Sequence, residues 1–83
     1  MVDAWPMEPR LQRVFAELFK VPPEKLTDAL SPDSVKGWDS LGHLTLVNAL
    51  EAEFEVTFED GDLTDMDTVG HIKDVLRRRG VKD

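Results

Sequence analysis

The chain of 83 residues has no cysteine and no long run of apolar residues. Without cysteine it cannot form a disulfide, a thiolate metal site or a thiol nucleophile from its own side chains. No segment approaches the roughly 18 consecutive apolar residues expected of a membrane span. Residues 1–6 also lack the basic region and apolar stretch of a targeting signal. We therefore expect a soluble, cytoplasmic protein with no membrane span.

Basic residues are missing from the middle of the chain. Residues 40–67 hold eight Asp or Glu and no Lys or Arg, whereas residues 68–83 hold two acids and five bases. The net charge of −7 argues against nucleic acid as a partner, because such binding needs basic side chains that neutralise phosphates. The negative stretch instead predicts partner proteins with basic docking surfaces, since opposite charge steers association.

The length allows one small domain, which we place over residues 1–83 and expect to act as a monomer. Apolar residues recur every three or four positions at about residues 8–20, which predicts a first helix. The run Val21-Pro22-Pro23 should end this helix, because proline cannot continue the hydrogen-bond ladder. A last helix is predicted at about residues 68–79, with Thr68 as its N-cap.

A second long helix is predicted from Ser40 to Phe54. Its buried face should consist of Leu44, Leu46, Val47, Leu50 and Phe54. Residues 21–39 form a long connection, which Leu26, Leu30, Val35 and Trp38 should anchor to the core. Residues 56–58 are too few for a strand without a partner, and residues 62–66 should make a short helical turn. The sequence thus predicts an all-α fold, a small four-helix bundle of three main helices and a short one, with a long first loop.

Ser40 lies where this long connection meets the second helix. Asp39 is a good N-cap for that helix, and Gly37 gives the backbone freedom to turn just before it. A helix N-terminus presents free N–H groups and the positive end of the helix dipole, which both favour a bound phosphate. The position therefore suits a serine that carries a phosphodiester.

In this order and length, the sequence pieces resemble the acyl carrier proteins of fatty acid and polyketide synthesis. The pieces are Asp39-Ser40-Leu41 at a helix start, Ala49-Leu50-Glu51-Ala52-Glu53-Phe54, Val56-Thr57-Phe58 and Asp67-Thr68-Val69-Gly70. The resemblance covers nearly the whole chain. It implies a carrier with no catalysis of its own.

The resemblance also implies roles for individual residues. Ser40 matches the serine to which a phosphopantetheinyl transferase attaches 4′-phosphopantetheine, whose thiol then holds acyl groups as thioesters. Asp39 matches the aspartate that helps to present that serine. Leu41 matches an apolar residue that contacts partner enzymes, which include acyl-loading and acyl-processing enzymes. We further expect His43, Leu46, Glu51 and Glu53 to contact such partners.

The chain departs from the fatty acid carriers beside Ser40. Those carriers usually have acids where this chain has Gly42 and Thr45, and a small pair where it has Gly37-Trp38. The departures favour a discrete carrier from polyketide, modified lipid or other specialised biosynthesis. An aminoacyl or peptidyl carrier is an alternative, as is an acidic interaction module that carries no cargo.

Two other kinds of site are weaker hypotheses. A hydrolase would need a base near Ser40 and a third group that orients it. His43 lies three residues from Ser40 on the same side of the helix, but Asp67 and His71 are one residue too far apart for the Asp-x-x-His of such hydrolases, and there is no Gly-x-Ser-x-Gly motif. The acids between Glu59 and Asp67 could attract a hard cation, but they lack the EF-hand spacing. We interpret them as a solvated acidic loop and expect no metal site.

Overall fold

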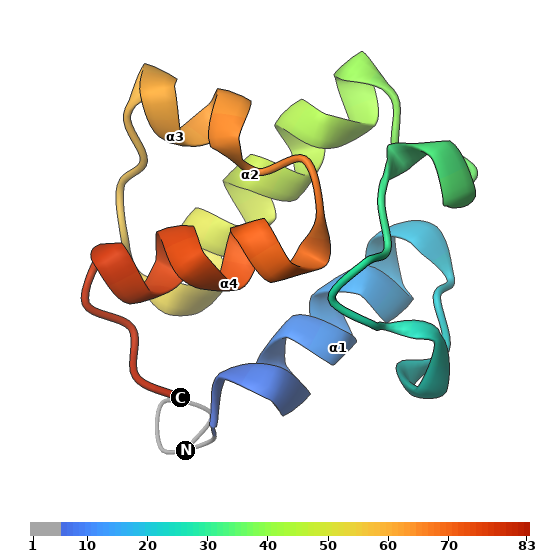
Figure 1. Ribbon diagram of the computed structural model, residues 1–83, viewed down its shortest axis with the longest axis horizontal. Helices are drawn as coiled ribbons and strands as arrows, with labels where there is room; N and C mark the ends of the chain where they lie inside the picture. The colour runs from blue at the N-terminus through green and yellow to red at the C-terminus, as the bar shows by residue number, and fades with distance from the viewer. Residues whose placement is uncertain (1–5) are drawn as a thin grey trace.

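The computed structural model describes residues 6–83 and consists of four α-helices joined by loops (Figure 1). The helices are α1 (Met7–Phe19), α2 (Ser40–Phe54), α3 (Asp60–Asp65) and α4 (Val69–Arg78), and two short 3₁₀ turns, η2 (Pro23–Lys25) and η3 (Pro32–Ser34), lie between α1 and α2. No strand occurs in residues 6–83. The predicted all-α fold with three main helices and a short one is confirmed.

One apolar core holds the three longer helices together. Its fully buried side chains come from every one of them: Leu11 and Phe15 of α1, Leu46 and Leu50 of α2, and Val69, Ile72, Val75 and Leu76 of α4. Each set follows the helical period of its own segment, which is why the predicted helices match the observed ones closely. Burial of this kind is the main favourable contribution to folding.

The long connection between α1 and α2 is anchored as predicted. Leu26, Val35 and Trp38 are buried, and Leu30 packs against the core. The ring of Trp38 lies 5.3 Å from that of Phe15 and 6.0 Å from that of Phe19, centroid to centroid. The connection also accepts hydrogen bonds from the N–H groups of Val69 and Gly70, so it caps the start of α4. This loop is therefore a fixed support for the residues that follow it.

The end of α1 differs in detail from the prediction. The helix stops at Phe19 because Lys20 adopts a left-handed conformation, with φ of 60°, before the prolines are reached. Its N–H then bonds the carbonyl of Ala16, a common way to close a helix. None of the helices in the described part of the chain is long and apolar enough to cross a membrane.

Candidate functional site

Ser40 is the first residue of α2, and its side chain is exposed. Asp39 caps the helix as predicted, because its carboxylate accepts a hydrogen bond of 2.8 Å from the N–H of Gly42. Gly37 has a φ of +94°, which lets the chain turn into the helix. Local sequence alone therefore places the Ser40 hydroxyl at an accessible helix start.

A groove of about 550 Å³ opens beside Ser40, between the first turns of α2 and the short helix α3. Trp38, Leu44, Leu63 and Met66 supply most of its apolar wall. A flexible chain attached to the Ser40 oxygen would thus have apolar surface within reach. This groove was not foreseen, because nothing in the sequence says which side of α2 the segment after residue 59 would cover.

His43 bridges the two sides of this groove. Its Nδ1 accepts a hydrogen bond of 2.9 Å from the indole N–H of Trp38, and its Nε2 lies 3.1 Å from the carbonyl oxygen of Leu63. Both contacts fit a single neutral tautomer, with the proton on Nε2. The imidazole is half-buried, stacked against Trp38 and occupied at both nitrogens, so it is not placed as a base for Ser40.

The apolar residues of α2 divide differently from the prediction. Leu41 is 73% exposed, which suits a partner contact, but Leu46 is fully buried and has no surface to offer a partner. The proposed contact through Leu46 is therefore wrong. Leu44, predicted for the core, is 53% exposed and borders the groove. The exposed residues of α2 are all uncharged: Ser40, Leu41, Leu44, Thr45, Asn48 and Ala52.

The acids of α2 serve the fold rather than the surface. Glu53 is hydrogen-bonded to both Arg10, at 3.0 Å, and Arg13, at 2.5 Å. Burial alone would raise the pKa of Glu53, but the hydrogen bonds from these two guanidinium groups outweigh it and lower the pKa. Glu51 accepts a hydrogen bond of 2.8 Å from the N–H of Phe58 and so holds the turn after α2. Both carboxylates are thus bonded within the fold, and their contact with partners stays a prediction.

The acidic segment after residue 58 is also tied to the fold. Asp62 is buried, forms a reciprocal cap with Glu59 and pairs with Arg79 at 2.9 Å. The hydrogen bond from the Glu59 N–H, reinforced by the bond from Arg79, lowers the pKa of Asp62. Asp65 pairs with Arg78. The interpretation as a solvated loop is thus wrong for Asp62, and no group of residues in the described part of the chain is arranged to hold a metal ion.

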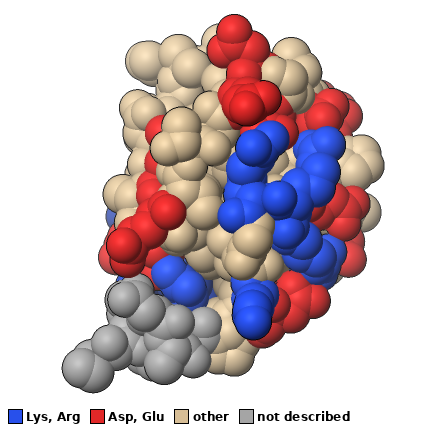
Figure 2. Space-filling model, turned by 90° about the vertical axis from the view of Figure 1, so that its left-hand side faces the viewer, with Lys and Arg blue, Asp and Glu red and all other residues tan. Residues whose placement is uncertain are grey.

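These ion pairs could not be predicted from the sequence, because their partners lie 13 to 43 residues apart along the chain. Figure 2 shows one consequence, a face on which basic and acidic side chains lie next to each other. Asp67 and His71 form a further exposed pair, one helical turn apart. Asp67 lines the groove beside Ser40, but within the described residues no hydrogen bond or ion pair links this aspartate–histidine pair to the serine.

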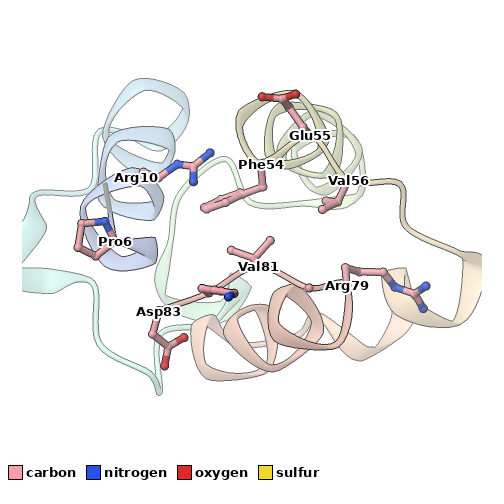
Figure 3. Close-up of a pocket in the computed structure, with 10 residues that line it drawn as sticks. Pro6, Arg10, Phe54, Glu55, Val56, Arg79, Val81 and Asp83 are labelled. Carbon is pink, nitrogen blue, oxygen red and sulfur yellow. The ribbon is translucent and has the colours of Figure 1, made fainter. Parts of the chain in front are cut away.

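A second cavity, of about 590 Å³, is slightly larger than the groove but lies at the other end of α2 (Figure 3). Phe54, Val56 and Val81 form its apolar wall, and Arg10 and Arg79 flank it. Ser40 begins α2 and Phe54 ends it, so this cavity is a helix length away from the serine. The smaller groove is therefore the better candidate for the functional site.

Comparison with known proteins identifies the family of this chain. Residues 9–76 match the family model described as "phosphopantetheine attachment site". A curated acyl carrier protein of Saccharopolyspora erythraea is 35% identical over 66 residues, which cover 80% of this chain and 70% of that protein. The solution structure of the holo acyl carrier protein from Geobacter metallireducens is 28% identical, with a TM-score of 0.78, over 90% of this chain and 86% of that one.

Proposed function

This chain belongs to the acyl carrier protein family, and we propose that Ser40 is the residue that carries its phosphopantetheine. The family membership makes the chain a carrier and not an enzyme, with a covalently attached phosphopantetheine as its cofactor. The cofactor supplies the thiol that a cysteine-free chain lacks. The observation that carries the assignment to Ser40 is its exposed hydroxyl at the capped start of α2, beside an apolar groove.

The residues around Ser40 fit such an attachment. Asp39 fixes the first turn of α2 through the N–H of Gly42 and so holds the serine outward. The wall formed by Leu44, Leu63 and Met66 offers apolar surface along which the alkyl part of a cargo can lie. Leu41, one residue beyond the serine, is the apolar contact for the transferase and for enzymes that act on the cargo.

The test of the attachment site is an intact-mass measurement. The unmodified protein is incubated with coenzyme A, Mg²⁺ and a broad-specificity phosphopantetheinyl transferase. We expect the mass to rise by one phosphopantetheine, and the Ser40→Ala variant to show no rise. Ser31→Ala is the matched control and should be modified like the wild type. Modification of Ser40→Ala, or none of the wild type with several transferases, would overturn the assignment.

We also propose that the carrier serves a specialised pathway, such as polyketide or modified lipid synthesis. The support is the uncharged exposed face of α2, where the fatty acid carriers that it resembles usually have acids. Exposed charges mainly raise association rates, so enzymes adapted to an acidic face should react slowly with this one. Phosphopantetheinyl transferases and enzymes of acyl loading and processing are the partners of this proposal.

A loading assay tests this second proposal. A malonyl transferase of fatty acid synthesis is given the modified chain, its Thr45→Glu variant, or a fatty acid carrier as reference. We expect slow loading of the chain and faster loading of the variant, because Thr45 is exposed and tolerates an acid. Loading of the unsubstituted chain as fast as the reference would refute the pathway proposal and leave the carrier function intact.

A further inference from the structure

Most basic side chains of this acidic protein are neutralised within the molecule. The pairs are Arg10 and Arg13 with Glu53, Lys73 with Glu8 and Asp28, Arg77 with Asp74 and Asp83, Arg78 with Asp62 and Asp65, and Arg79 with Glu59 and Asp62. Figure 2 shows basic side chains gathered on one face with acidic side chains directly beside them. Such side chains offer little free positive charge to a partner.

Lys20, Lys25 and Lys36 differ from this pattern. All three are exposed, and no carboxylate of residues 6–83 lies within ion-pair distance of them. They line one groove of about 370 Å³, formed by the end of α1 and the two 3₁₀ turns that follow. No acidic residue belongs to the lining of this groove, which we call the lysine groove.

The lysine groove has an apolar floor and a fixed shape. Phe19, Val21 and Val35 line it between the lysines, and Val21 and Val35 are buried in the core. The left-handed backbone conformation of Lys20 at the end of α1 sets the position of this lysine. A Cβ atom added to Gly37 would lie 3.6 Å from the Phe19 ring, so the segment after Lys36 passes close to the end of α1. Lysines from three separate parts of the loop are thus brought together by packing.

The groove is also connected to the carrier site. Lys36 precedes Ser40 by four residues, and Trp38 between them stacks on Phe19, which lines the groove. An enzyme that reaches Ser40 along this loop would therefore meet the lysines. Its contact with the exposed face of α2 would be uncharged, so the lysine groove is a positively charged feature that orients it on this side of the site.

We propose that the lysine groove docks an acidic segment of a partner enzyme, one that carries several carboxylates and one apolar side chain. The carboxylates pair with the lysines, which lack counter-ions, and the apolar side chain covers the floor between them. The sequence alone predicts partners with basic docking surfaces, whereas the lysine groove predicts a partner with an acidic segment. Because the whole chain carries a net charge of −7, the surface outside the groove repels an acidic partner, which confines its binding to this groove. This proposal rests on the proposed carrier function in one respect only, namely that the partner is an enzyme that acts on the carrier.

The test is an NMR titration of the ¹⁵N-labelled full chain with the acetylated peptide Glu-Glu-Leu-Glu-Glu at low salt. We expect amide shifts that concentrate at residues 19–25 and 30–37 and that vanish in 0.5 M salt, a concentration at which the screening length is roughly 4 Å. Lys25→Glu with Lys36→Glu should weaken the peptide binding by about fivefold or more, since each exposed pair contributes a fraction of a kcal/mol. Lys82→Glu, a lysine outside the groove, is the control and should bind like the wild type.

Three results would overturn the proposal. These are shifts spread evenly over the surface, an unchanged affinity in the double variant, or tighter binding of adenosine 3′,5′-bisphosphate than of the peptide at the same residues. The last result would assign the groove to a phosphate ligand. Because the titration does not need a modified Ser40, it gives the same answer in Ser40→Ala. Failure of the docking proposal is therefore separate from failure of the attachment assignment.

Discussion

A Cβ atom added to Gly42 would lie 1.9 Å from the carbonyl oxygen of Gly37. The turn before α2 therefore folds back against the first turn of the helix, and only a residue without a side chain fits between them. The absence of a side chain at Gly42 thus lets the carbonyl of Gly37 approach the helix backbone closely. Any acid introduced at Gly42 would disturb the same turn that positions Ser40.

Substitution of Gly42 by alanine should destabilise the protein. The steric clash should cost roughly 1–3 kcal/mol, more than the gain of about 1 kcal/mol from better helix propensity. Gly61→Ala in α3 is the matched control, because an added Cβ there has no neighbour within 4 Å. Urea unfolding followed by circular dichroism measures both variants. Equal stability of Gly42→Ala and the wild type would contradict the close approach.

Glu53 should stabilise the fold through its two arginines. Glu53→Gln should lower the free energy of unfolding by about 1.5–3 kcal/mol, the range for hydrogen bonds to charged groups. Arg10 is buried and would lose its counter-ion. Glu17→Gln is the control, because Glu17 is exposed, and a surface change of this kind usually stays within about 0.5 kcal/mol.

The ion pairs of Glu53 also make the free energy of unfolding depend on pH. The pKa of Glu53 is lower in the folded protein than its ordinary value of 4.5. The contribution of Glu53 to the free energy of unfolding is therefore fully present above about pH 4.5, and it is lost as the pH falls through the lower pKa of the folded state. Unfolding measured between pH 6 and pH 3 should show a steeper loss in the wild type than in Glu53→Gln. Parallel curves for the two proteins would show that Glu53 is not the titrating group.

Alanine substitutions of Leu41 and Leu46 should distinguish a loss of partner docking from a loss of stability. Leu46→Ala should cost about 2–5 kcal/mol, because it leaves a cavity in the core. Leu41→Ala should leave stability nearly unchanged but slow the transfer of phosphopantetheine to Ser40, since the side chain is exposed beside the serine. Transfer rates at saturating and limiting carrier concentration measure this effect. An unchanged rate for Leu41→Ala would remove Leu41 from the docking surface.

His71 should titrate above its ordinary value of 6.5, because its hydrogen bond with Asp67 raises its pKa. The raised pKa means that the charged imidazole is favoured in the folded state, and this contribution is lost as the pH rises through the folded value. NMR of the imidazole protons should show the raised pKa, and Asp67→Asn should return it towards 6.5. A pKa that is unaffected by Asp67→Asn would show that the pair does not form in solution.

Features that depend on neighbouring residues were predictable from the sequence. The ends of α2, its cap at Asp39 and the exposed position of Ser40 follow from helix periodicity and capping, which act over a few residues. The division between Leu44 and Leu46 was not predictable. α2 is apolar over most of its circumference, so periodicity could not decide which leucine faces the core and which borders the groove.

The sequence by itself determined the four helices, the anchored loop and the position of Ser40 at the start of α2, because short-range rules largely govern each of them. Only the tertiary structure decided which charges are available to a partner. Arg10 and Glu53 are 43 residues apart in the chain, and their contact depends on how α1 packs against α2. The same packing ties Glu53 to two arginines and leaves the three lysines of the lysine groove unpaired among residues 6–83. The net charge of the sequence does not show which charged side chains are paired, because pairing depends on distances in space.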